Sequence, residues 1–254
     1  MPRLCRAIVL LLLIEAGAVG LFACAPAAAT ALHLSSACRE TRRIALTFDD
    51  GPNRPYTDQI VAILASHHAR ATFFDEGQAV DAHPETVRAE LAAGMAVGAH
   101  SWSHSQALPS ASPDEFDRDT TMGAAAIAQA AGFEPAFYRS PYGHTSGMML
   151  RELHKLGYVS IGWDVDSRDW NTASTVDEIV NNVLSNAHPG AIVLMHDGGL
   201  GGGDPDRTRT IEALPRIIEG LQADGYALVT IPEATGLQLA QPTTKEDGLR
   251  CSAN

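Results

Sequence analysis

Short apolar runs alternate with longer amphipathic segments along most of the chain. The apolar runs predict buried strands at 44–48, 71–74, 95–99, 136–138, 158–165, 191–195 and 226–231. Segments with apolar residues at helical spacing predict helices at 57–68, 84–93, 113–131, 146–156, 176–186 and 208–223. Strands that alternate with helices indicate parallel pairing and right-handed crossovers. This α/β pattern fits a barrel or a doubly wound sheet, and seven strands favour a barrel with one strand missing.

The N-terminal segment has the layout of a secretory signal. Arg3 and Arg6 precede the apolar run 7–14, and small residues follow it. The run is too short to span a bilayer, and a buried N-terminal helix is the alternative reading. Cys24 ends the sequence Leu-Phe-Ala-Cys, which resembles a bacterial lipobox except for the bulky Phe22, whereas 27–29 offers an ordinary cleavage site. We therefore expect export, either as a free protein or as a lipoprotein anchored through Cys24.

The composition indicates one globular catalytic domain. The 254 residues are 45% apolar and 19% charged, which is enough to bury a sizeable core. The formal net charge of −12 argues against binding to nucleic acid or to anionic lipid, because both need clustered cations. We predict a signal peptide with a candidate lipobox at 1–29, a linker at 30–42, the catalytic domain at 43–232 and a C-terminal tail at 233–254. We expect a monomer.

The cysteines fit an oxidising compartment. Cys5 lies in the signal segment, and the other three are Cys24, Cys38 and Cys251. Cys38 and Cys251 can pair and connect the two ends of the domain, which would leave Cys24 for a lipid anchor.

Polar clusters follow the predicted strands. They are Asp49-Asp50 after the first strand, 100–104 after the third, 139–143 after the fourth, 164–170 at the end of the fifth and His196-Asp197 after the sixth. In parallel α/β barrels the carboxyl ends of the strands carry the active site. We therefore expect these five segments to converge on one pocket.

Two of these clusters suit a metal. His100 and His104 are four residues apart, a spacing that places both imidazoles on one side of a helical turn. A carboxylate from Asp49-Asp50 would complete three protein ligands and leave a position open for water or substrate, as in catalytic zinc sites. The alternative for the Asp pair is a turn in which one carboxylate caps the next segment.

His196 and the tryptophans have two readings each. His196 is a general-acid candidate if Asp169 bonds to one ring nitrogen, and otherwise a structural histidine at a strand end. Trp102 and Trp170 lie inside polar clusters, where indoles can line an acetyl pocket or stack on sugars, and we assign Trp163 to the core.

Five ordered motifs resemble those of the polysaccharide deacetylases, carbohydrate esterase family 4. They are Thr47-Phe48-Asp49-Asp50-Gly51-Pro52, His100-Ser101-Trp102-Ser103-His104, Arg139-x-Pro141-Tyr142-Gly143, Asp166-x-x-Asp169-Trp170 and Leu194-x-His196. The resemblance spans about 43–231 and implies a distorted (β/α)7 TIM-like barrel. It also implies an enzyme that hydrolyses acetyl groups from a polysaccharide such as peptidoglycan or a chitin-like polymer.

The resemblance also implies a role for each matching residue. Asp50, His100 and His104 would bind a divalent metal, for which we expect Zn²⁺ with Co²⁺, Mn²⁺ and Ni²⁺ as alternatives. Asp49 would be the general base, oriented by Arg139, and His196 the general acid, tuned by Asp169. The main-chain N–H of Tyr142 would bind the oxyanion. Substrate-binding residues would be Trp170, Leu194, Trp102 and Pro141.

Some positions depart from the family pattern. Asp75-Glu76 replaces residues that the family often keeps apolar or small, and Ala99 stands where an asparagine is common. The segment 163–170 resembles that of some acetylxylan esterases, so ester cleavage stays an alternative. Further alternatives are a carbohydrate-binding cell-wall protein without turnover, a small-molecule amide hydrolase and a structural lipoprotein.

Overall fold

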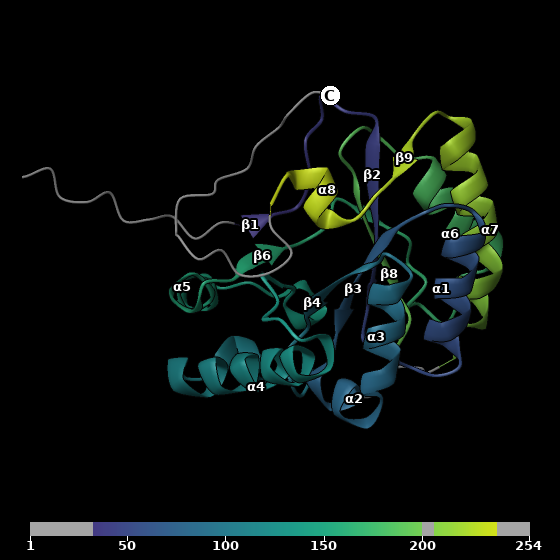
Figure 1. The fold of residues 1–254 in the computed structure, drawn as a ribbon. Helices are drawn as coiled ribbons and strands as arrows, with labels where there is room; N and C mark the ends of the chain where they lie inside the picture. The colour runs from purple at the N-terminus through teal and green to yellow at the C-terminus, as the bar shows by residue number, and fades with distance from the viewer. Residues whose placement is uncertain (1–32, 200–205, 238–254) are drawn as a thin grey trace, which may run out of the picture. The chain divides into compact units, whose positions relative to one another are not determined.

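A parallel sheet forms the centre of the protein (Figure 1). The computed structural model describes residues 33–199 and 206–237, all of which belong to one compact unit. The strands are β1 (His33–Leu34), β2 (Arg43–Asp49), β3 (Ala71–Asp75), β4 (Ala96–Ala99), β5 (Phe137–Tyr138), β6 (Val159–Ile161), β7 (Val165–Asp166), β8 (Ile192–His196) and β9 (Ala227–Leu228). Their order is β1-β6-β5-β4-β3-β2-β8-β7, and β9 pairs with β2. The predicted signal segment, Cys24 and Cys251 lie outside the described residues.

The helices pack around this sheet. They are α1 (Tyr56–Ser66), α2 (Gly77–Ala82), α3 (Pro84–Ala92), α4 (Pro113–Ala131), α5 (Gly147–Leu156), α6 (Val176–Leu184), α7 (Thr208–Ala223) and α8 (Ile231–Thr235), with short 3-10 turns at Leu108–Ser110 and Pro141–Gly143. In Figure 1, α1, α6 and α7 lie together on the right, and α2 and α4 lie at the bottom. All six predicted helices are confirmed to within two residues at each end. In the part of the chain that the structure describes, no helix is long and apolar enough to cross a membrane.

The pleat of β2 explains how the core and the site share one strand. Ile44, Leu46 and Phe48 belong to the apolar cluster that α1 and α7 cover, and the ring of Phe48 stacks on that of Phe73 at 5.2 Å between centroids. Ala45 faces the other way, into a second apolar cluster. Since successive side chains of a strand alternate between faces, Asp49 follows Ala45 toward that second side.

The capped ends of α4 show why the sequence pattern locates helices well. Ser112 accepts a hydrogen bond from the N–H of Glu115, whose side chain accepts one from the N–H of Ser112 in return. Gly132 ends the helix in the left-handed conformation, with φ at 84°. Similar capping boxes begin α6 and α8.

The single strand predicted at 158–165 is wrong, because the structure divides it. β6 pairs with β5 and β1, whereas β7 pairs with β8 on the far edge of the sheet. The carbonyls of Ile161 and Gly162 accept hydrogen bonds from Arg139, so they are not available to continue a strand ladder. Within the described residues, β1 and β7 therefore each have one neighbouring strand, and the barrel stays open between them.

Three further differences involve short elements. The strand predicted at 226–231 is confined to Ala227–Leu228, because Thr230 caps α8 and starts a helical turn. β1 lies in the segment predicted as a linker and pairs with Ser160 and Ile161 of β6. Two residues are too few for a periodic pattern, so this strand could not be predicted from the sequence. α2 was also not predicted.

Candidate active site

One cavity of about 360 Å³ lies where the strands end. Its lining residues are Asp49, Asp50, His100, His104, Tyr142, Gly143, Trp163, Asp166, Trp170, Leu194, His196 and Arg207. All five polar clusters of the sequence contribute to this list. The convergence follows from the parallel strands, which bring distant segments together at one edge.

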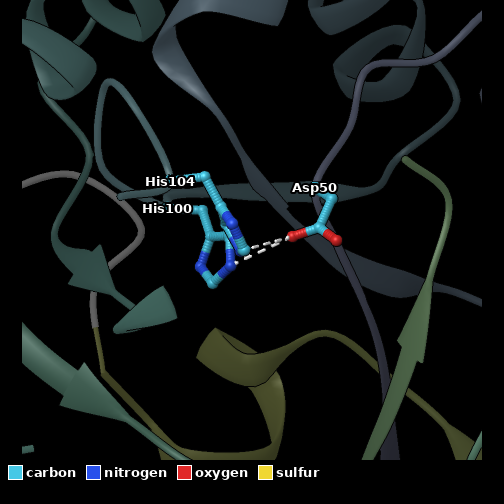
Figure 2. Close-up of side chains that lie close together, drawn as sticks. All are labelled: Asp50, His100 and His104. Atoms are coloured by element: carbon cyan, nitrogen blue, oxygen red, sulfur yellow. Dashed lines mark ion pairs between the residues drawn. The ribbon is translucent and has the colours of Figure 1, made fainter. Parts of the chain in front are cut away.

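Asp50, His100 and His104 form a buried group in this cavity (Figure 2). Oδ1 of Asp50 lies 3.2 Å from Nε2 of His100 and 3.0 Å from Nε2 of His104. One ligand atom from each residue lies within 4.8 Å of the others. Nδ1 of His100 lies 2.8 Å from the carbonyl of Arg139 and donates a proton to it, which leaves Nε2 as a lone-pair donor toward Asp50.

The donor chemistry of this group fits a divalent cation. Although both imidazole nitrogens are close to Oδ1 of Asp50, neither has the direction of a hydrogen bond to it. Burial alone would raise the pKa of Asp50, but the neighbouring imidazoles and His196 outweigh burial and hold that pKa well below its usual range. An ionised carboxylate and two imidazoles that converge on one point are the ligands that first-row divalent metals take.

Asp49 is held by a buried arginine. Nη1 of Arg139 donates to Oδ1 of Asp49 and to the hydroxyl of Thr47, each at 2.7 Å. The other two nitrogens of the guanidinium, Nε and Nη2, donate to the carbonyls of Ile161 and Gly162 at 3.3 and 2.9 Å. Burial lowers the pKa of Arg139, while Asp49 opposes that shift. The guanidinium is thus fixed on four sides, and it leaves Oδ2 of Asp49 facing His100 at 3.9 Å from Nε2.

His196 has a strong carboxylate partner. Its Nδ1 lies 2.7 Å from Oδ1 of Asp169, and its main-chain N–H donates to Oδ2 of the same carboxylate at 2.8 Å. The hydroxyl of Thr210 also donates to that Oδ2, at 2.9 Å. Burial alone would lower the pKa of His196, but Asp169 outweighs it and raises the pKa to about 9. With Nδ1 bonded in this way, Nε2 is the nitrogen left to exchange a proton with a ligand.

Comparison with known proteins identifies the family to which the chain belongs. A sequence model described as polysaccharide deacetylase matches residues 36–161. A peptidoglycan-N-acetylglucosamine deacetylase of Bacillus cereus is 36% identical over 192 residues, which cover 75% of this chain and 86% of the relative. The chain belongs to the polysaccharide deacetylase family. The protein is thus a hydrolase, and the enzyme class expected from the five motifs is confirmed.

Two further relatives support the same family. A chitooligosaccharide deacetylase of Azorhizobium caulinodans is 34% identical over 212 residues, which cover 78% of this chain and 99% of the relative. A family 4 carbohydrate esterase from Streptomyces lividans, solved in complex with acetate, is 34% identical with a TM-score of 0.68, covering 79% of this chain and 98% of that one. This match confirms the distorted (β/α)7 barrel expected for a polysaccharide deacetylase.

The aromatic residues around this deacetylase's cavity differ in part from expectation. Trp170 and Tyr142 line the cavity with 50% and 40% of their surface exposed, and Leu194 lines it from β8. Trp163, which we assigned to the core, packs against an apolar cluster and also lines the cavity. Trp102 does not line it, because its indole packs against Gly77 of α2, where an added Cβ would lie 2.6 Å from Cε3.

Two other residues change the expected site. Pro141 is buried and does not line the cavity. Arg207 lines it without having been predicted. Its buried Nε donates to the carbonyl of Gly198 at 2.6 Å. No motif marks Arg207, which stands directly before α7.

Left-handed backbone conformations concentrate at the site. Asp50, Ser101, His104 and Tyr142 have φ values of 73°, 67°, 48° and 58°. Such conformations are uncommon for residues other than glycine and cost free energy, so the surrounding structure must hold them. At Asp50 the change of conformation breaks the alternation of the strand, which lets Asp49 and Asp50 both reach the same cavity. Gly198 packs against this turn so closely that an added Cβ would lie 1.8 Å from the carbonyl oxygen of Asp50.

Helix α4 holds the loop that carries the two histidines. Asp119 accepts hydrogen bonds from the N–H of Trp102 at 2.9 Å and from the hydroxyl of Ser103 at 2.5 Å. Gly123, one turn further along, lies against the main chain of Ser101, where an added Cβ would come within 2.4 Å of the carbonyl oxygen. The hydroxyl of Ser101 in turn accepts a bond from the N–H of His104. The helix therefore fixes the loop from outside the cavity.

Proposed function

We propose that this polysaccharide deacetylase uses a divalent metal to remove acetyl groups from N-acetylglucosamine units of a cell-wall or chitin-like polysaccharide. The observation that carries the proposal is the meeting of three groups in one cavity. These are the Asp50, His100 and His104 group, the Asp49–Arg139 pair and the His196–Asp169 pair. A carbohydrate-binding protein without turnover would need no such combination of ligands, base and acid.

Asp50, His100 and His104 would hold the metal, for which Zn²⁺ is the first choice and Co²⁺, Mn²⁺ and Ni²⁺ are alternatives. When bound, such a cation supplies Lewis-acid polarisation of the acetyl carbonyl and makes a nearby water more acidic.

The protein's own residues would move the protons. Asp49, held by Arg139, accepts the proton of the attacking water. The main-chain N–H of Tyr142 would bind the oxyanion that develops on the acetyl group. His196, kept protonated by Asp169, donates a proton to the departing nitrogen.

The pairing of His196 with Asp169 in the cavity favours amide over ester cleavage, because it supplies a positioned general acid. An amine leaves only after its nitrogen is protonated, whereas an alcohol is a better leaving group and depends less on an acid. Acetylxylan esterase activity stays the second candidate, because 163–170 resembles the same segment of such enzymes. Trp170, Trp163, Leu194 and Tyr142 would contact the acetylated sugar, since they line the cavity.

We further propose that the enzyme acts outside the cytoplasm. In the proposed order of segments, a signal peptide at 1–29 is followed by a linker at 30–42, a catalytic domain at 43–232 and a tail at 233–254. Cys38 is disulfide-bonded, with a partner outside the described residues. A disulfide supports an oxidising compartment, and pairing with Cys251 stays a prediction. Anchoring through a lipid on Cys24 and a monomeric state are proposed on the sequence alone.

Acetate release from peptidoglycan, chitin oligomers and acetylxylan, with metal-stripped and zinc-loaded protein, tests the proposal. We expect zinc-dependent release from at least one of the two N-acetylated polymers and less from acetylxylan. Asp50→Ala is the control that lacks a proposed metal ligand. Equal activity of the metal-stripped protein would overturn the metal dependence, and release from acetylxylan alone would favour the esterase.

A further inference from the structure

The second imidazole of the metal group lacks the support that the first one has. Nδ1 of His100 bonds to the carbonyl of Arg139. Nδ1 of His104 is buried, and among the described residues it has no hydrogen-bond partner. A histidine that binds a metal through one nitrogen almost always donates the other N–H to a carboxylate, a carbonyl or a water. If His104 binds a metal through Nε2, its Nδ1–H therefore needs an acceptor that the hydrogen bonds of the described residues do not provide.

Glu76 lies between the two segments that carry the metal ligands. Its N–H donates to the carbonyl of Gly51, directly after Asp50, at 2.8 Å. The next residue, Gly77, donates its N–H to the carbonyl of Ser101 at 2.9 Å, and Gln78 follows with a bond to Trp102. The main chain of Glu76 is thus tied on one side to the Asp50 turn and on the other to the histidine loop.

The side chain of Glu76 is buried, and one of its carboxylate oxygens has no partner among the described residues. The residue is 1% exposed, and its Oε2 has no hydrogen-bond partner among the described residues. Burial raises the pKa of this carboxyl to about 7, while the charge of His104 acts in the opposite direction. The carboxylate of Asp119, which also adjoins the histidine loop, is already occupied by Trp102 and Ser103. Two buried polar groups without partners, one donor and one acceptor, thus belong to the same small region.

We propose that Glu76 is a positioning residue of the metal site, whose carboxylate accepts the Nδ1 proton of His104 through one buried water. This inference rests on the proposed metal-dependent function. The bond would fix the tautomer of His104, so that Nε2 presents its lone pair beside Oδ1 of Asp50. It would also give a reason for an acidic residue at a position that the family often keeps apolar or small.

The test measures metal affinity rather than turnover. Zinc dissociation constants are determined by competition with a chelator for the wild type, Glu76→Met and Glu76→Gln, and Co²⁺ absorption spectra are recorded for each. Met keeps the length of the side chain and removes the acceptor, whereas the amide oxygen of Gln can still accept the proton. Asp81→Asn is the matched control, because it removes an exposed carboxylate from α2, the helix that begins directly after Glu76. Thermal unfolding of each metal-free protein reports folding separately.

We expect Glu76→Met to weaken zinc binding by about 10- to 100-fold, Glu76→Gln to lose clearly less, and Asp81→Asn to match the wild type. The unfolding midpoint of metal-free Glu76→Met should not fall in proportion, because no formed hydrogen bond is removed from the metal-free protein. Zinc affinity of Glu76→Met within threefold of the wild type would overturn the inference and leave the proposed function intact. The same holds if Glu76→Gln binds zinc as weakly as Glu76→Met. A wild type that binds no zinc, or binds it equally well after Asp50→Ala, would instead overturn the proposed function and the inference with it.

Discussion

Asp49 and His196 are register partners at the carboxyl ends of the neighbouring parallel strands β2 and β8. The pairing continues one residue further, where the N–H of Asp197 donates to the carbonyl of Asp49 at 3.1 Å. Neighbouring strands lie about 4.8 Å apart, so the sheet itself sets the backbone separation of the proposed base and acid. Their relative position therefore depends on a buried ladder rather than on a surface loop.

Asp49→Asn should separate proton transfer from metal binding. The amide keeps the shape of the side chain and can still accept a hydrogen bond from Arg139, but it cannot take a proton from water. We expect acetate release to fall by about 10²- to 10⁴-fold, while the zinc content per chain stays that of the wild type. Asp50→Ala is the contrasting variant and should lose the zinc. Full activity of Asp49→Asn would refute the assignment of the base.

Asp169→Asn should move the alkaline limb of the pH–rate profile to lower pH. Asp169 raises the pKa of His196, so the protonated imidazole persists to higher pH in the wild type than it would without that charge. Removing the charge lowers this pKa, and the acid form is lost at a pH lower by about one unit or more. A profile of kcat from pH 6 to 10 measures the shift. Thr210→Val, which keeps the carboxylate and removes only its hydroxyl partner, should leave the limb near its wild-type position.

Asp119→Ala should weaken metal binding although this residue is not a ligand. It removes both hydrogen bonds that α4 makes to the loop between His100 and His104, so the strained loop conformation loses its support. We expect zinc affinity to fall by about tenfold or more. The control is Asp117→Ala on the same helix, which removes an ion pair with Lys155 at 3.0 Å on the surface. Equal losses in the two variants would mean that α4 acts only through general stability.

Asp75 and Glu90 should make the metal-free protein less stable as the pH rises. Burial raises the pKa of both carboxyls, the charge of Asp197 raises both further, and the charge of Asp75 adds to the shift of Glu90, which favours the protonated form of each in the folded protein. The unfolded chain releases these protons above about pH 4, which favours unfolding progressively at higher pH. The double variant Asp75→Asn/Glu90→Gln removes this linkage, so its urea midpoint should fall less between pH 5 and pH 8. Parallel pH dependences of variant and wild type would contradict the assignment of two buried neutral acids.

The helices and the strand-end clusters could be predicted because each depends on local pattern. The box around Ser112 and Glu115 marks the start of α4, and the parallel strands then bring Asp49 and His196 to the same edge. The tryptophans were assigned less well: a polar neighbourhood in the sequence suggested that Trp102 lines the cavity, and a place in a predicted strand assigned Trp163 to the core alone, although it also lines the cavity. Their positions depend on α2 and on the break in the sheet after β6.

Other features depend on contacts between segments that are far apart in the chain. The apolar run at 158–165 predicts one continuous strand, but Arg139 donates hydrogen bonds to the carbonyls of Ile161 and Gly162, where the strand ends. Arg207 belongs to no motif, and its position in the cavity follows from the start of α7. Glu76 reads as a departure from a family pattern, and only its burial and its main-chain bonds suggest a purpose.

The pairing of β2 with β8 also sets the order in which the enzyme can become active. During synthesis, β2 emerges early, and it can pair with β8 only after residues 192–196 have been synthesised. A nascent chain that ends before β8 contains Asp50, His100 and His104 but lacks His196 and the strand beside Asp49. Pairings between such distant segments form slowly, because a long loop must close first. An unfinished or truncated chain would therefore be able to carry the metal ligands without being able to hydrolyse an amide.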